Sequence, residues 1–188
     1  MKKKILIIAS IVMIVILGIV LFIGYCILDS REKITNIEKY EKYLGENGKY
    51  KSHYGTYNDI FPNTIPENAE VEDFIYYYYN PWDANYLGYL VYTCDQDTFE
   101  SEYNRLKSLS SSKDINIYGT TQFPYDLCAV YADEYYGYIY ALADGENLRF
   151  IYVELQFANH FSDIKYADYI PEKYLPNGFD ATGKSYSK

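Results

Sequence analysis

The chain has 188 residues, of which 17 are Lys or Arg and 26 are Asp or Glu, so its formal net charge at pH 7 is −9. Without residues 1–29, the remainder carries 14 basic and 25 acidic side chains, a net charge of −11. Such a surface repels phosphate backbones and anionic lipid headgroups, which excludes nucleic acid as a partner. The 26 tyrosines exclude no function, because most aromatic side chains serve packing.

An uncharged apolar segment follows three lysines at the N-terminus. As a helix, residues 5–28 span about 36 Å, which is enough to cross a bilayer core. The segment is longer than the apolar part of a secretory signal peptide, and it ends without an A-x-A cleavage pattern. We therefore predict an uncleaved signal anchor whose partner is the lipid bilayer. By the positive-inside rule, residues 1–4 stay in the cytoplasm and this single-pass chain carries its C-terminal domain outside the cell membrane.

Cys26 leaves a lipoprotein as the alternative. Lipoprotein signal peptidases cut before a cysteine near the end of an apolar segment, and Cys26 has that position. The residue before such a cysteine is normally small, whereas Tyr25 is large, and the length of the segment favours an anchor. Lipidation of Cys26 stays open, and both interpretations place the rest of the chain outside.

Residues 29–59 are predicted to connect the membrane to the folded domain. Between residues 29 and 44, apolar side chains recur at helical spacing among charged ones, which indicates a membrane-proximal helix. These apolar residues are Ile34, Ile37, Tyr40 and Leu44. Gly45 and Gly48 end the helix, and an irregular linker follows. The packed domain is expected to begin near Ile60.

Two strands and a helix begin that domain. Residues 70–80 and 86–93 are rich in aromatic and β-branched side chains and are predicted as strands. Asp97 is predicted as the N-cap of the following helix, since Glu100 stands three residues later. The apolar face of this helix carries Phe99, Tyr103 and Leu106.

A β-hairpin is the clearest unit of the second half, after candidate strands at 115–118 and 127–132. Residues 135–143 and 148–157 are apolar segments joined by Asp-Gly-Glu-Asn, which predicts an antiparallel hairpin. Two-residue and four-residue loops leave the parity of pairing unchanged, so the faces follow from alternation alone. The face predicted to meet the core carries Tyr136, Tyr138, Tyr140, Leu142, Ile151, Val153 and Leu155. The other face is amphipathic and carries Ile139, Ala141, Phe150, Tyr152, Glu154 and Gln156.

The order of these elements favours an α+β fold. Strands precede and follow a single main helix, so we expect an antiparallel sheet of about five strands with that helix packed on it. The extracytoplasmic α+β domain is assigned to residues 60–182, and residues 183–188 form a polar tail.

No residues form a recognisable metal, cofactor or catalytic site. The two histidines, His53 and His160, lack further ligands at the spacing that zinc requires. Cys94 and Cys128 are candidates for a disulfide in an oxidising compartment, and buried free thiols are the open alternative. We expect no metal, no cofactor and no catalytic residue.

The functional hypothesis depends on aromatic side chains. In a strand over 70–80, successive tyrosines alternate sides, so only half of them can face the core. The candidate binding residues are Tyr77, Tyr79, Trp82 and Tyr86, which would form a platform for sugar rings or for a protein. We interpret the chain as a non-catalytic, membrane-tethered binding or accessory module of a bacterial cell envelope that engages an envelope protein or glycan. The alternative is a cell-wall-directed hydrolase that uses carboxylates or Cys128 with His160.

Overall fold

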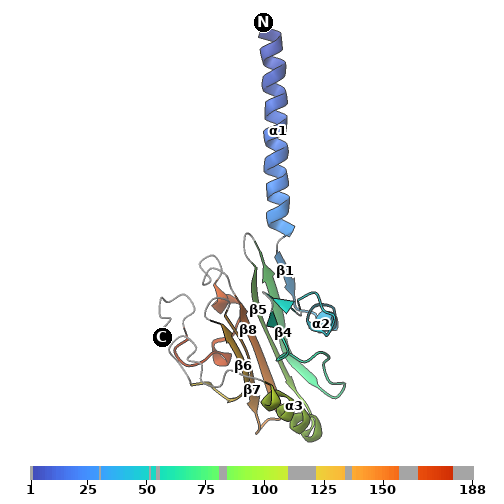
Figure 1. Ribbon diagram of the computed structural model, residues 1–188, viewed down its shortest axis with the longest axis vertical. Coiled ribbons are helices and arrows are strands. Elements are labelled where there is room, and N and C mark those ends of the chain that lie inside the picture. The colour runs from blue at the N-terminus through green and yellow to red at the C-terminus, as the bar shows by residue number, and fades with distance from the viewer. Residues whose placement is uncertain are drawn as a thin grey trace.

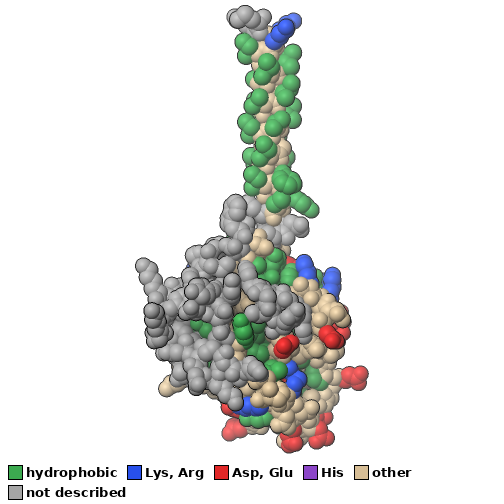
Figure 2. Space-filling view, viewed as in Figure 1, with side chains coloured by type: hydrophobic (Ala, Val, Ile, Leu, Met, Phe, Trp, Pro, Cys, Tyr) green, Lys and Arg blue, Asp and Glu red, His purple; other side chains and the backbone are tan. Residues whose placement is uncertain are grey.

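A long helix stands apart from a sheet-based domain in the computed structural model (Figure 1). The structure describes residues 2–29, 31–50, 52–53, 56–80, 84–109, 122–133, 137–156 and 165–179. Helix α1, Lys2–Asp29, exposes its apolar side chains along its length, and Lys3–Cys26 is long and apolar enough to cross a membrane (Figure 2). Such a helix near the N-terminus fits a signal anchor or a signal sequence.

The domain contains one six-stranded sheet in the order β1-β4-β5-β8-β7-β6, and every neighbouring pair is antiparallel. Its strands are β1 Arg31–Ile34, β4 Glu70–Tyr79, β5 Asn85–Thr93, β6 Asp126–Asp133, β7 Gly137–Asp144 and β8 Arg149–Gln156. Strands β2 Ser52–His53 and β3 Thr56–Tyr57 form a separate pair. The α+β class and the antiparallel sheet with one helix packed on it are confirmed. The candidate strand at 115–118 lies outside the described residues.

Strand β1 replaces the first part of the helix predicted for residues 29–44. Residues 31–34 pair with residues 79–76 of β4, and only the later part is helical, as η1 Ile37–Lys39 and α2 Tyr40–Leu44. The prediction was wrong at residues 31–34 because backbone pairing with a distant strand outweighed the local helical spacing. Ile34, Tyr40 and Leu44 are buried against the sheet, so these residues share its core although the sequence grouped them with a linker.

The hairpin is confirmed, with residues 145–148 between β7 and β8 and Asp144 paired with Arg149. The described residues of the face predicted to meet the core do so, whereas Tyr136 lies outside the described residues. Residues 165–179, with η2 Tyr166–Asp168 and η3 Glu172–Tyr174, pack against this face. The face predicted to be amphipathic is also fully covered, and Glu154 and Gln156 are buried there. We call the first face the C-terminal side. We call the second the helical side, because α2 and the helix that follows β5, α3 Gln96–Ser108, lie over it.

Helix α3, Gln96–Ser108, has its N-cap two residues before the predicted one. Asp95, rather than Asp97, is the N-cap, and its side chain accepts a hydrogen bond from the Thr98 amide at 2.9 Å. The predicted apolar face is confirmed, since Leu106 is fully buried and the Phe99 ring stacks on Phe150 at a centroid distance of 4.7 Å.

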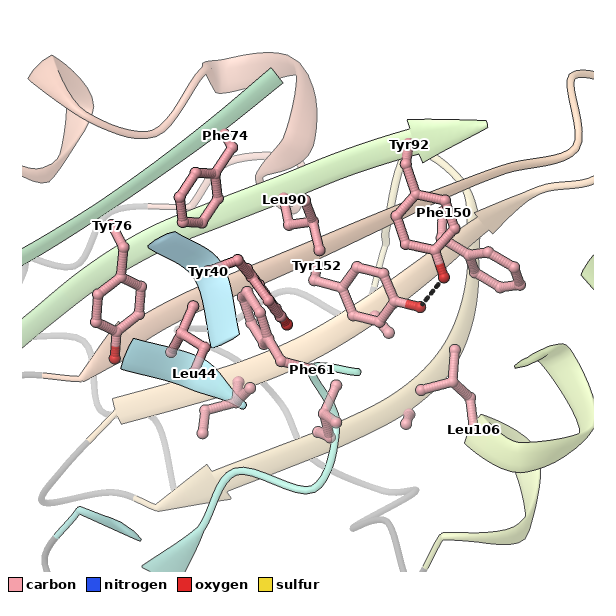
Figure 3. Packing of buried hydrophobic residues seen from close by; sticks show 14 of the residues in the cluster. Tyr40, Leu44, Phe61, Phe74, Tyr76, Leu90, Tyr92, Leu106, Phe150 and Tyr152 are labelled. Atoms are coloured by element: carbon pink, nitrogen blue, oxygen red, sulfur yellow. Dashed lines mark hydrogen bonds between the residues drawn. The ribbon is translucent and has the colours of Figure 1, made fainter. Parts of the chain in front are cut away.

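Tyrosines fill much of the core on the helical side. Figure 3 shows Tyr40, Phe61, Phe74 and Tyr76 packed over the strands, with the Tyr92 and Tyr152 hydroxyls 3.0 Å apart. Tyr152 donates to Glu102 of α3 at 2.5 Å. Buried phenols need a hydrogen-bond partner, so polar atoms of the covering layer complete the tyrosine core.

Gly88 is required for one close approach in this core. It stands between Tyr76 of β4 and Glu154 of β8 in the register, and the Tyr76 ring lies over it. An added Cβ would overlap the Tyr76 ring and lie 3.1 Å from the Ile75 carbonyl oxygen. The glycine therefore leaves the space through which the Tyr76 side chain crosses β5.

We predict that Gly88→Ala lowers the free energy of unfolding by about 1–3 kcal/mol, because the new methyl group overpacks the site. Urea unfolding followed by circular dichroism measures the change. The matched control is Gly145→Ala, whose Cβ would meet nothing within 4 Å. Equal stability of the two variants would contradict the steric role of Gly88.

Candidate functional site

The predicted aromatic platform is not formed by the residues that the structure describes. Tyr77 and Tyr79 lie on the C-terminal side of the sheet, whereas Tyr86 lies on the helical side, and all three are buried. Tyr77 stacks on Tyr169 at a centroid distance of 4.5 Å. Trp82 lies outside the described residues. The three described tyrosines therefore fill two separate cores and do not share an exposed surface.

The two cysteines predicted as a possible disulfide are free thiols. Cys94 follows β5 and Cys128 belongs to β6, with β8 and β7 between them in the sheet. The three strand spacings between β5 and β6 amount to about 14 Å, whereas a disulfide needs its two Cα atoms within about 7 Å. Burial raises the pKa of the Cys94 thiol to about 11 and that of Cys128 to about 12. Neither thiol has the lowered pKa of a cysteine nucleophile, and His160 lies outside the described residues.

Most carboxylates that the structure describes near the sheet serve structural contacts. The Glu102 carboxylate accepts hydrogen bonds from Arg105 Nε at 2.6 Å and from the Tyr152 hydroxyl. Arg105 also donates hydrogen bonds to the carbonyl oxygens of Asp59 and Ile60. This network ties α3 to the segment before β4. The described residues contain no group of three His, Cys, Asp or Glu side chains that could hold a metal ion.

Glu32 of β1 is the centre of a polar cluster at the end of the sheet nearest α1. Its carboxylate accepts hydrogen bonds from the hydroxyls of Tyr43 at 2.6 Å and Tyr50 at 2.5 Å and from Lys49 Nζ at 2.8 Å. Partial burial raises the pKa of this carboxyl, but the three donors outweigh burial and lower the pKa to about 2. These side-chain hydrogen bonds connect β1 to α2 and to the residues that follow α2.

Glu154 of β8 is a second, fully buried carboxyl on the same side of the sheet. Its carboxyl group accepts hydrogen bonds from Gln156 Nε2 at 2.6 Å and from Asn58 Nδ2 at 3.0 Å. The Tyr76 side chain crosses over Gly88, and its hydroxyl also forms a hydrogen bond with Glu154. Burial raises the pKa of Glu154 to about 7, because hydrogen bonds from these donors oppose the desolvation only in part. Glu154 is therefore a proton-binding group near neutral pH that lies within the core.

Tyr50 joins the two carboxyl clusters. Its ring stacks on Tyr43 at 5.8 Å and on Tyr76 at 5.7 Å between centroids. Tyr43 contacts Glu32, and Tyr76 contacts Glu154. Hairpin parity had placed Glu154 on the amphipathic face, but no sequence signal identified Asn58 or Tyr76 as its partners.

A groove opens beside β4 where β1 ends. It has a volume of about 490 Å³ and is lined by Thr35, Asn36, Ile37, Val71, Glu72, Asp73, Phe74, Ile75 and Tyr89. Asp73 accepts the Tyr89 hydroxyl at 2.8 Å with one carboxylate oxygen and the Phe74 amide at 2.9 Å with the other. The groove combines strand backbone with acidic and apolar side chains.

Comparison of the chain with models of protein families, with curated proteins and with solved structures gave no match. The geometry of the chain itself therefore carries the functional argument.

Stability is expected to fall as pH rises from about 4.5 to about 7, the ordinary and folded pKa values of Glu154. In that window the folded chain keeps the Glu154 proton while the unfolded chain has lost it, so the expected loss is about 3 kcal/mol. Glu154→Gln should remove this dependence, as measured by urea unfolding at pH 5 and pH 8. Glu146→Gln, an exposed turn position, is the matched control. An unchanged pH dependence in Glu154→Gln would contradict the assignment.

The free thiols give a second test. In protein unfolded without reductant, iodoacetamide should alkylate both Cys94 and Cys128, as measured by mass spectrometry of the digested chain. A pair that reacts only after reduction would show that the two residues are bonded.

Proposed function

We propose that the chain is a non-catalytic, membrane-tethered module on the outer side of a bacterial cell membrane, where it binds or assists another envelope protein. The observation that carries this proposal is the connection between α1 and the sheet. One residue separates Asp29, the end of α1, from Arg31, the start of β1. With α1 in a bilayer, the sheet is held directly beside the membrane surface.

The attachment is firm as well as short. All four residues of β1 pair with β4, and Glu32 binds Tyr43, Tyr50 and Lys49. A flexible linker would let the domain search the cell wall, whereas this connection restricts its reach to the layer next to the bilayer. Partners in the same membrane are therefore favoured over distant wall material.

A protein partner is also favoured over a glycan. Stacking on sugar rings requires exposed aromatic faces, and the described members of the predicted platform are buried on both sides of the sheet. The exposed large apolar residues among those described lie on α1. Residues 30–188 carry a net charge of −11, which suits a partner with basic side chains.

Photo-crosslinking of the full chain in its own membrane tests the proposal. A benzophenone amino acid at Lys33, an exposed position of β1, should capture a membrane-protein partner. The same group at Glu146, in the turn at the opposite end of the sheet, should capture it less because that position lies farther from the bilayer.

A released form of the domain provides the control. Replacing residues 1–28 with a cleavable signal peptide should abolish the Lys33 product, because tethering supplies the high local concentration. If neither position yields a protein product in the tethered chain, the proposed function is wrong. If the released domain crosslinks equally well, the tether has no role in binding.

A further inference from the structure

Part of the β4 edge next to β1 pairs with no strand that the structure describes. Strand β4 contains ten residues, and β1 pairs with only four of them, residues 76–79. The chain leaves the sheet after Ile34, and the Asn36 side chain caps η1 by accepting the Glu38 amide at 2.9 Å. No other described strand pairs with residues 70–75 of β4 on the side where β1 pairs with residues 76–79. Five of these residues, 71–75, line the groove over about 17 Å of strand, and the Phe74 amide among them already donates to the Asp73 carboxylate.

The groove lies beside β4 where the chain leaves β1. Thr35, Asn36 and Ile37 line it on the β1 side, and residues 71–75 line it from β4. An incoming strand placed there would extend β1 and pair with β4 through backbone hydrogen bonds. Exposed strand edges commonly bind an added strand in this way.

The two sides of this groove differ in chemistry. A bulge between Val71 and Asp73 sets which side chains face each way. Asp73 and Ile75 point to the C-terminal side, where Asp73 receives the Tyr89 hydroxyl. On the helical side the groove meets apolar residues that pack on the core there, namely Ile37, Val71 and Phe74. An added strand would therefore match the groove with basic and apolar side chains in alternation.

Charge separates a foreign partner from a second copy of this chain. Glu70, Glu72 and Asp73 are exposed along the edge, and one basic side chain, Arg149, contacts Glu72 at 3.4 Å. Two copies paired through this edge would place these carboxylates opposite one another, and like charges opposite each other destabilise a strand pair. The whole chain is acidic as well, with a net charge of −9.

We propose that the edge of β4 at residues 70–75 binds an extended, basic segment of a partner protein by strand addition. The inference rests on the proposed function, because it names the contact through which the tethered domain holds its protein partner. Backbone hydrogen bonds with β4 supply affinity. The acidic side chains on one side of the added strand and the apolar side chains on the other select a segment that alternates Lys or Arg with Val or Ile.

Peptide binding to the full chain in phosphatidylcholine nanodiscs tests the inference by fluorescence anisotropy. The probe is a labelled seven-residue peptide in which Lys and Val alternate, and empty nanodiscs correct for binding to lipid. A peptide with Glu in place of Lys should bind at least about tenfold more weakly. A peptide with Pro in place of each Val should also lose binding, because proline has no amide hydrogen to donate to the β4 backbone.

Two protein variants locate the site. Glu70→Lys with Glu72→Lys should weaken binding of the Lys peptide by about tenfold and improve binding of the Glu peptide. The reason is that the two substitutions replace negative side chains beside the β4 edge with positive ones. The matched control, Glu46→Lys with Glu146→Lys, changes exposed residues that do not line the groove and carries the same charge change. Circular dichroism confirms that both variants are folded.

Three outcomes overturn strand addition at this edge: no binding of the Lys peptide, equal binding of the Pro peptide, or equal effects of the two double variants. The Lys33 crosslink separates these failures from failure of the proposed function. A protein crosslink that persists in Glu70→Lys with Glu72→Lys shows that the tethered module binds its partner elsewhere. Loss of the crosslink in that variant alone supports the β4 edge as the contact.

Discussion

The middle strands of the sheet carry large side chains on both faces, and this constraint governs the rest of the structure. All residues of β7 are buried, and β5 and β8 are buried apart from one end residue each. Each face therefore needs its own cover, which residues far apart in the sequence supply. Residues 165–179 cover one face, and α2, α3 and the segment before β4 cover the other. The tyrosines are used mainly for this two-sided packing, which buries the three described members of the candidate platform.

Tyrosine differs from phenylalanine in this role because every ring brings a hydroxyl into the core. The hydroxyls converge on a few carboxylates, so Glu32, Glu102 and Glu154 act as acceptors from neighbouring layers. Two of these groups respond to pH in opposite ways. The lowered pKa of Glu32 stabilises the fold above about pH 2, whereas the raised pKa of Glu154 favours the fold below about pH 7. The same chemistry that satisfies the phenols makes the core sensitive to protons.

Local patterns in the sequence predicted the local elements well. The hairpin faces followed from parity, and the α3 face followed from the spacing of Phe99, Tyr103 and Leu106. Contacts between distant segments were not predictable in this way. Residues 31–34 continue the helical spacing of residues 37–44, yet they pair with β4, and nothing in their own periodicity encodes that partner. Parity likewise placed Tyr77 and Tyr79 together but gave no sign that residues 165–179 cover them. The groove depends on where β1 stops, which is a property of the sheet rather than of any motif.

The short passage from α1 into β1 also has a mechanical consequence. Only one residue lies between α1 and β1, so few backbone dihedrals are available there to absorb a turn of α1 about its own axis. If α1 spans a bilayer, as proposed, the way it packs in the lipid and against its neighbours would then influence the direction in which the β4 edge points. A helix that rotates on meeting another transmembrane segment would sweep this edge toward or away from that segment's outer domain.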